Sequence, residues 1–438
     1  MPEPIDLLIE PHWLIPIEPR GVVLEDHAVA VSSGRIVDVL PAREAPNRYL
    51  PARKVVLPKQ VLIPGLINLH THAAMALLRG IADDLPLMDW LNTRIWPAEA
   101  KHVSAAFVRD GTLLACAEML RGGITCFNDM YFFPEAAAEA ANCLGMRAAL
   151  GIIVIEFPTA YASDADDYLS KGLALRDRLR RDPLISFCMA PHAPYTVADR
   201  TFERIATLSA QLDLPIHVHI HETKNEIEQS MVRHGMRPLQ RLQRLGLLGP
   251  GLIGVHAVHL DESEVALMAE NGCTVAHCPT SNMKLASGAA PTVQLDKFGV
   301  RLGLGTDGAA SNNRLDMFQE MRHAGLLAKV TSGDAAVLHA HALLRMATLN
   351  GAAALGLEDR IGSIESGKAA DLCAIRLDAL EASPCFDPAS HLVYAAGREH
   401  VSHVWVDGVL RVENGMLSGY DTSQLLDTVN LWQNRLTA

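Results

Sequence analysis

Eight apolar, strand-like segments alternate with helix-like segments through the middle of this 438-residue chain, and this alternation limits the fold more than any other feature. Strands that are joined through helices pair in parallel, and eight of them suggest closure into a barrel. The segments read VLIPGLINLH, GITCFNDM, RAALGIIVIE, LISFCMAPH, LPIHVHIHE, LIGVHAVHL, GCTVAHCPTSN and VRLGLGTDGA. An open, doubly wound sheet is the alternative.

The two ends of the chain also resemble each other. The first sixty or so residues are strand-like, and the last seventy or so contain strand patterns and the tight-turn signal VDG. We therefore expect both termini to contribute to one small β-domain beside the barrel.

The charge and composition of the chain limit the kinds of molecule that it is expected to bind. The chain carries 38 basic and 50 acidic residues, a net charge of -12, and no Lys/Arg run, so neither nucleic acid nor a membrane is an expected partner. There is no signal-peptide pattern at the start and no apolar run of membrane-spanning length. The eight cysteines are scattered without a CxxC pair, which fits a reducing cytoplasm.

Two histidines, His70 and His72, end the first strand-like segment with one residue between them. Side chains at i and i+2 of a strand point to the same face, so both imidazoles could grip one metal ion. The alternative is a pair of structural histidines near solvent. The other strand ends decide between the two interpretations.

Ionisable groups recur at those other ends, which form the active-site edge of an eight-stranded barrel. They are His192, His217, His219, His221, Glu222, His256, His259, His277 and Asp307. Only closure of the barrel brings these residues together, and a metal held by three imidazoles and one carboxylate satisfies such a cluster. Alternation alone does not choose among His217, His219 and His221.

Several motifs resemble the amidohydrolase superfamily, and in particular its branch that deaminates S-adenosylhomocysteine and 5'-methylthioadenosine. They are PGLINLHTHAAM, HIHET, GVHAVHL, HCPTSNMKLASG, GTDGAASNN and GKAADL, in the same order along the chain. The resemblance implies an α/β protein with a distorted (β/α)8 TIM barrel and a β-sandwich from both termini. We assign the barrel to residues 64–365 and the sandwich to residues 1–63 and 366–438.

The same resemblance implies that His70, His72, His219 and Asp307 bind the metal. The family pattern H-x-x-E selects His219 and Glu222 within HVHIHE. Relatives with two metals use a lysine at the fourth strand end, and CMAPHAPYT has none. We therefore expect one ion per subunit, zinc, with Fe²⁺ and Mn²⁺ as alternatives. His217 is expected to pack inside the barrel, and the roles of His221, His259 and His277 stay open.

The implied reaction replaces the amino group of an adenine nucleoside by oxygen. A metal-activated hydroxide attacks purine C6, and Glu222 moves a proton to the neighbouring ring nitrogen. Asp307 takes the remaining proton, and His256 stabilises the attacking oxygen. The products are the inosine analogue and ammonia.

Substrate recognition in the family points to Glu99 for the ribose hydroxyls, His192 for the nucleoside and Arg147 for the carboxylate of homocysteine. No second arginine follows Arg147 within a dozen residues, so we expect 5'-methylthioadenosine to be preferred over S-adenosylhomocysteine. A triazine or guanine-type hydrolase and a metal-free scaffold are the alternatives. The family also implies a homo-oligomer.

Overall fold

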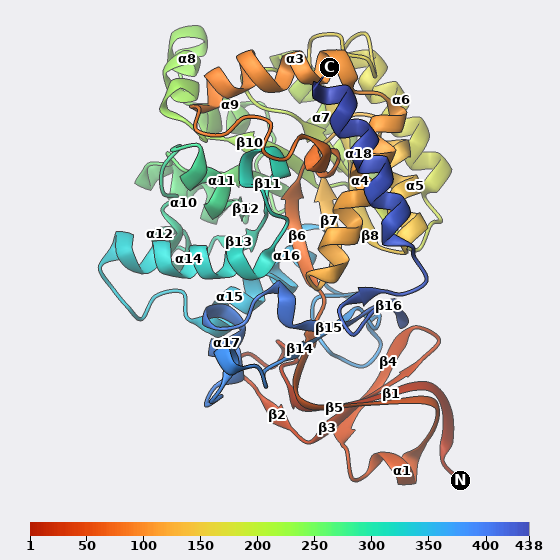
Figure 1. Ribbon diagram of the computed structural model, residues 1–438. Helices are drawn as coiled ribbons and strands as arrows, with labels where there is room; N and C mark the ends of the chain where they lie inside the picture. Colours follow the sequence, from red (N-terminus) through yellow and green to blue (C-terminus); the bar gives the residue numbers. More distant parts are fainter. Residues whose placement is uncertain (438) are drawn as a thin grey trace.

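The computed structural model describes residues 1–437 and shows a parallel β-barrel beside a second sheet built from both ends of the chain (Figure 1). Within those residues the barrel sheet has eight strands, all paired in parallel and ordered as they occur in the sequence. They are β6 (Leu66–Thr71), β7 (Ile124–Asp129), β8 (Arg147–Val154), β9 (Ile185–Pro191), β10 (Ile216–Ile220), β11 (Leu252–His256), β12 (Thr274–His277) and β13 (Arg301–Leu304). The predicted barrel is confirmed.

The last strand meets the first at their carboxyl ends. The backbone N–H of Asp307 donates to the carbonyl oxygen of His70 at 3.0 Å, and Asn68 exchanges two hydrogen bonds with Thr306. Gly305 makes this approach possible, because a Cβ there would lie 2.8 Å from the Cβ and backbone nitrogen of His70. The closure places Asp307 beside His70, although 236 residues separate them.

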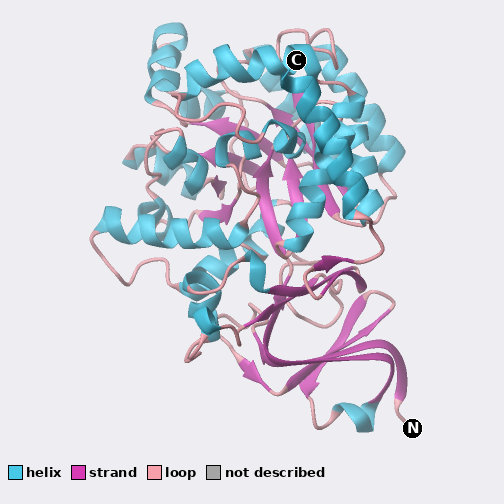
Figure 2. Ribbon diagram, viewed as in Figure 1, coloured by secondary structure: helices cyan, strands magenta, loops and turns pink. Residues whose placement is uncertain are grey.

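Helices connect the strands and cover the outside of the barrel (Figure 2). Local residues mark where these helices begin and end. In α4, for example, the side chain of Ser104 caps the first turn by accepting the N–H of Phe107, and Gly122 follows the last helical residue. The helices are α4 (Ala105–Arg121), α5 (Pro134–Leu144), α6 (Ala165–Leu179), α7 (Asp199–Leu212), α8 (Lys224–His234), α9 (Pro238–Arg244), α10 (Glu262–Glu270), α11 (Pro279–Lys284), α12 (Thr292–Lys297), α13 (Ala309–Asn312), α14 (Met317–Ser332), α15 (Ala340–Met346) and α16 (Leu349–Ala354). Among residues 1–437, none of the helices combines the length and apolar character that crossing a membrane requires.

The second sheet is mixed and takes strands from both termini, as predicted. The order β17-β16-β15-β14-β5-β1-β3-β4 places C-terminal strands directly beside N-terminal ones. The strands are β1 (Glu3–Leu14), β3 (His27–Ser32), β4 (Arg35–Pro41), β5 (Tyr49–Pro64), β14 (Leu372–Arg376), β15 (Val401–Val406), β16 (Val409–Glu413) and β17 (Met416–Leu417), with β2 (Leu24–Glu25) paired to β1. Leu7, Val31, Leu62, Leu372 and Trp405 share one buried cluster, which binds the two ends of the chain together.

The C-terminal segment does not all join this sheet. Residues Thr422–Thr437 form helix α18, which lies along α4 of the barrel (Figure 1). Trp432 packs edge-on against Phe107 and donates its indole N–H to Asp110 at 2.8 Å. The positions of the domain boundaries, 63/64 and 365/366, stay a prediction.

Arg147 lies at the first residue of β8, at the end of the barrel that faces the second sheet. Its guanidinium donates to both carboxylate oxygens of Asp371, at 3.0 and 3.1 Å, and to the carbonyl oxygen of Pro183. The expectation that Arg147 binds substrate is therefore wrong. A residue that begins a parallel strand is at the opposite end of the barrel from one that ends it, and the side chain of Arg147 is committed to a buried ion pair between the two sheets.

Candidate functional site

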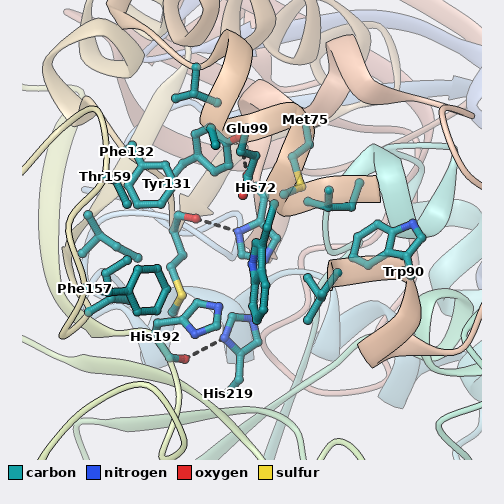
Figure 3. A pocket seen from close by; sticks show the side chains of 18 of the residues that line it. His72, Met75, Trp90, Glu99, Tyr131, Phe132, Phe157, Thr159, His192 and His219 are labelled. Carbon is teal, nitrogen blue, oxygen red and sulfur yellow. Dashed lines mark hydrogen bonds between the residues drawn. The ribbon is translucent and has the colours of Figure 1, made fainter. Parts of the chain in front are cut away.

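A cavity of about 490 Å³ opens at the carboxyl ends of the barrel strands. Seven ionisable side chains from the sequence-based candidates or their neighbours line it: His72, Glu99, His192, His219, Glu222, His256 and Asp307. His70 is fully buried at the inner end, in contact with Asp307. Apolar residues form most of the remaining wall, among them Met75, Trp90 and Phe157 (Figure 3).

Three histidine rings at the inner end are each fixed through Nδ1. The Nδ1 of His72 lies 2.6 Å from the carbonyl oxygen of Met130, and that of His219 lies 2.7 Å from the carbonyl oxygen of His192 (Figure 3). The Nδ1 of His70 lies 2.9 Å from Nε2 of His217. A carbonyl only accepts, so His72 and His219 must carry their protons on Nδ1, and each Nε2 is left with a free electron pair.

These free electron pairs converge. Nε2 of His219 lies 3.3 Å from Nε2 of His70, and Oδ1 of Asp307 lies 3.3 Å from Nε2 of both His70 and His72. Several lone pairs at such distances repel one another unless a positive charge lies between them. Imidazole nitrogens with a carboxylate oxygen are donors that Zn²⁺ and Fe²⁺ accept. The residues present therefore fit a divalent cation.

Two overlapping sets of donors meet the distance requirement for one ion. One comprises His70, His72 and His219, and the other comprises His70, His256 and Asp307, with the donor atoms of each set within 4.8 Å of one another. The structure thus brings together all four predicted ligands and adds His256 at the edge of the group. Their role as metal ligands stays a prediction.

Asp307 is held in place by its own neighbours. Ser281 and Ser311 donate their hydroxyls to Oδ2 at 2.6 and 2.9 Å, and the N–H of Gly308 donates to Oδ1 at 2.7 Å. Asp307 also has a left-handed backbone, with φ of 62°. The two serines were not among the sequence-based candidates, although both lie in motifs quoted there.

Burial sets the charge of this inner end. It lowers the pKa of His70 to about 4, although the negative charge of Asp307 beside it acts in the opposite direction, so that this imidazole is neutral at neutral pH. Burial also raises the pKa of Glu222, while the nearby His256 lowers it. A carboxyl group whose pKa is raised is more easily protonated, which suits it to gaining and losing a proton during catalysis.

Glu222 is fixed at the edge of the donor group. Its side chain is 7% exposed, and its Oε2 lies 3.7 Å from Nε2 of His256. Nδ1 of His256 contacts Oδ1 of Asn282 at 2.8 Å. The buried carboxylate of Glu226 accepts the backbone N–H groups of His221 and Glu222, at 3.0 and 2.9 Å. The sequence analysis missed Glu226, although it follows Glu222 by only four residues.

The structure also shows where the four remaining strand-end histidines lie. His221 follows the last residue of β10 with φ of 52°, so strand alternation ends there and its ring turns away to accept the N–H of Leu239 at 3.0 Å. His217 lies inside the barrel, as expected, and contacts His70. His259 bonds the carbonyl oxygen of Ser287, and His277 is buried without lining the cavity.

The two other predicted substrate contacts lie on the cavity wall, and the ring centroid of His192 is 5.0 Å from that of His219. Glu99 comes from α3 (Trp96–His102), and the hydroxyl of Tyr131 donates to its Oε1 at 2.7 Å. Burial raises the pKa of Glu99 to about 7, and Tyr131 opposes that rise. His192 follows β9, and its Nδ1 lies 3.0 Å from the hydroxyl of Thr196.

Comparisons with known proteins agree with this geometry. Residues 61–411 match the model of the Amidohydrolase family. A "5-methylthioadenosine/S-adenosylhomocysteine deaminase" of Teredinibacter turnerae is 47% identical over 434 residues, 99% of this chain and 98% of that protein. One of Thermodesulfovibrio yellowstonii is 42% identical over 98% of each chain.

Solved structures give the same picture. An adenosine deaminase from Xanthomonas campestris with bound zinc superposes with a TM-score of 0.98, is 53% identical and covers 100% of both chains. The zinc complex of atrazine chlorohydrolase TrzN from Arthrobacter aurescens has a TM-score of 0.90 but is only 25% identical, over 98% of this chain and 100% of its own. Triazine hydrolases are therefore the more distant relatives.

Proposed function

This chain belongs to the amidohydrolase family, and from that premise we propose that it is a metal-dependent hydrolytic deaminase of 5'-methylthioadenosine and related adenine nucleosides. The reaction takes up water at purine C6 and releases ammonia, leaving the inosine analogue. The names of the relatives at 42–47% identity support this substrate class over the triazine or guanine-type alternative. The resemblance noted in the sequence is confirmed at the level of the family and of this branch.

We assign the metal to His70, His72, His219 and Asp307, with His256 at its edge. The convergence of their electron pairs supports the assignment, and the bound zinc of the Xanthomonas campestris structure supports zinc as the ion. When bound, such an ion lowers the pKa of water and so supplies the nucleophile near neutral pH.

Glu222 carries the first proton. Its carboxylate removes a proton from the attacking water and delivers it to N1 of the purine, which makes C6 electrophilic. The anchoring of its backbone by Glu226 and its position 3.7 Å from His256 keep the carboxylate at one place in the cavity. General acid–base catalysis of this kind contributes roughly 10²–10⁴ in rate.

His256 and Asp307 complete the transfer. The ring of His256, held at Nδ1 by Oδ1 of Asn282, is hydrogen-bonded through Nε2 to the attacking oxygen and orients it toward C6. Asp307 accepts the remaining proton of that oxygen and passes it to the amino group. The C6–N bond then breaks, C6 becomes a carbonyl, and ammonia leaves with a full set of protons.

Glu99 and His192 are our proposed contacts to the nucleoside sugar. Both line the cavity, and a carboxylate on an apolar wall needs donors such as ribose hydroxyls to be satisfied. A free base or a triazine brings no such hydroxyls and would leave Glu99 with Tyr131 as its only donor among the described residues. A substrate with a ribose therefore fits the cavity better.

The cavity also favours an uncharged 5' substituent. Among the described residues that line it, none is a lysine or an arginine, and Arg147 is bonded to Asp371 elsewhere. Trp96 and Phe157 form an aromatic pair on the wall, with ring centroids 6.5 Å apart. The homocysteine carboxylate of S-adenosylhomocysteine finds no charged partner here and so lacks roughly 1.5–3 kcal/mol of binding free energy. We therefore expect about ten- to a hundredfold higher kcat/KM for 5'-methylthioadenosine than for S-adenosylhomocysteine.

The observation that carries the proposal is the convergence of the Nε2 atoms of His70, His72 and His219 with the carboxylate of Asp307. Glu222 lies at the edge of this group of donors. The test is a panel of purified-enzyme assays that measure ammonia release, with the change from adenine to hypoxanthine absorbance recorded as well for the adenine nucleosides. Its substrates are 5'-methylthioadenosine, S-adenosylhomocysteine, adenosine, guanine and melamine. We expect turnover of the adenine nucleosides and none of melamine; turnover of guanine or melamine alone would contradict the proposal.

We further propose a cytoplasmic enzyme that acts as a homo-oligomer on a small nucleoside, with neither nucleic acid nor membrane as partner. The net charge of -12 supports the absence of nucleic acid, and all eight cysteines are free, as a reducing compartment requires. The homo-oligomer rests on the family resemblance, and light scattering of the purified protein tests it.

A further inference from the structure

Glu99 lies on the cavity wall next to Tyr131, a residue to which the proposed mechanism assigns no role. Tyr131 donates its hydroxyl to Oε1 of Glu99 at 2.7 Å, a short bond of the kind that forms between a hydroxyl and a carboxylate. Figure 3 shows the two side chains meeting at the wall, above the ring of His72. Because Tyr131 occupies one oxygen of the carboxylate, Oε2 is the oxygen left to accept from a ligand.

The bond also helps to keep Glu99 ionised. Burial raises the pKa of Glu99 to about 7, and the hydrogen bond from Tyr131 is the cause that opposes it. A protonated carboxyl group would present a donor to a hydroxyl on one of its oxygens, whereas a carboxylate accepts on both. The tyrosine therefore favours the form of Glu99 that can accept from two neighbouring ribose hydroxyls.

Tyr131 is itself held rigidly, and by the same segment that fixes a candidate metal ligand. It is 4% exposed and follows Met130, whose carbonyl oxygen contacts His72 at 2.6 Å and whose N–H donates to the carbonyl oxygen of Thr71 at 3.0 Å. Asp129, one residue earlier, accepts the N–H of Ala73 at 2.8 Å. The exit of β7 thus sets the position of Glu99 relative to the inner end of the cavity.

We propose that Tyr131 is a positioning residue that orients Glu99, so that Oε2 of Glu99 accepts hydrogen bonds from the ribose 2'- and 3'-hydroxyls. In this way Tyr131 makes the site selective for ribonucleosides. The inference rests on the proposed function, because it assigns a role at that same site. It concerns the sugar and not the chemistry at C6.

The experiment compares wild type and Tyr131→Phe on 5'-methylthioadenosine and on its 2',3'-dideoxy counterpart. For the hydroxyl-bearing substrate, the loss of one bond to a charged group raises KM by about five- to thirtyfold, with kcat changed less than about threefold. For the dideoxy substrate, Tyr131→Phe changes neither constant by more than about twofold, because no hydroxyl is there for Glu99 to receive. A loss of packing would lower activity on both substrates alike.

Two further variants make the outcome decisive. In a Glu99→Ala background, adding Tyr131→Phe has no effect on either substrate if the tyrosine acts through Glu99, and a persisting effect overturns that role. Tyr49→Phe is the matched control, since Tyr49 donates the same kind of bond to Asp38, at 3.0 Å, in the terminal sheet; it leaves both substrates unaffected.

The results also separate this inference from the proposed function. If wild type deaminates neither nucleoside, the proposed function fails. If wild type deaminates both but Tyr131→Phe alters them by equal factors, or alters neither, the enzyme assignment stands and the role of Tyr131 is refuted.

Discussion

Replacing Glu222 by glutamine removes a proton carrier and leaves the shape of the site intact. Glutamine has the same size, and the backbone N–H of residue 222 still donates to Glu226 at 2.9 Å, so the loop does not move. The side chain of Glu222 is 7% exposed, and burial raises the pKa of the carboxyl group. A neutral amide at this position does not carry the cost of a buried charge, so we expect no loss of unfolding free energy above that pKa.

The effect on catalysis is large. General acid–base transfer contributes roughly 10²–10⁴ in rate, which corresponds to about 3–5 kcal/mol of transition-state free energy. Because Glu222 is not among the donors that converge on the metal, Glu222→Gln should bind the ion as wild type does. We therefore expect kcat on 5'-methylthioadenosine to fall by at least about a hundredfold, while KM changes less than about threefold.

The assay is steady-state deamination at saturating nucleoside, with metal content measured on the same preparation and thermal unfolding as a check on folding. Glu228→Gln, a change on the exposed face of α8, is a matched control that should behave as wild type. If fully metal-loaded Glu222→Gln keeps kcat within about tenfold of wild type, another group carries the proton and our mechanism is refuted.

Two other predictions test separate parts of the account. Arg147→Ala should lower the free energy of unfolding in urea by about 3–5 kcal/mol, because it leaves Asp371 buried without its partner. The kcat/KM of the folded enzyme should stay within about twofold on both 5'-methylthioadenosine and S-adenosylhomocysteine. A selective loss of activity on S-adenosylhomocysteine would show that Arg147 contacts the substrate after all. The pKa of Glu99 is raised to about 7, and the sugar hydroxyls need its ionised form, so kcat/KM for a ribonucleoside should rise as the pH increases through about 7. A 2',3'-dideoxy nucleoside should lack this rise, and identical pH profiles for the two substrates would contradict the role of Glu99.

The sequence supports the fold and the donor group because both depend on repeating patterns. Eight strand-like segments between helices predict the barrel, and barrel geometry collects whatever ends the strands. His70, His72 and Asp307 were found in this way. They lie at strand ends, and the strand-end rule needs no knowledge of side-chain rotamers.

Other features depend on where a strand begins or stops, and the pattern does not settle that. Arg147 was placed at the cavity, but it starts β8 and so lies at the far end of the barrel. His217, His219 and His221 were equivalent by alternation until the left-handed backbone of His221 turned its ring away. One residue at a strand boundary decides each of these cases.

Long-range partners were not predictable at all. The carbonyl oxygens of Met130 and His192 fix two rings, and a carbonyl leaves no trace in the sequence. Tyr131 meets Glu99 across 32 residues and two different elements, with no spacing that links them. Helix α18 was missed because strand patterns earlier in the C-terminal segment were extended over it.

The most direct test of the whole account is the metal content of purified wild type, His219→Ala and Asp307→Ala, measured by plasma mass spectrometry beside deaminase activity. We predict about one equivalent of zinc per active wild-type subunit, and the loss of both ion and activity in the two variants. Full activity of metal-stripped wild type, or a full complement of tightly bound ion in both variants, would contradict it.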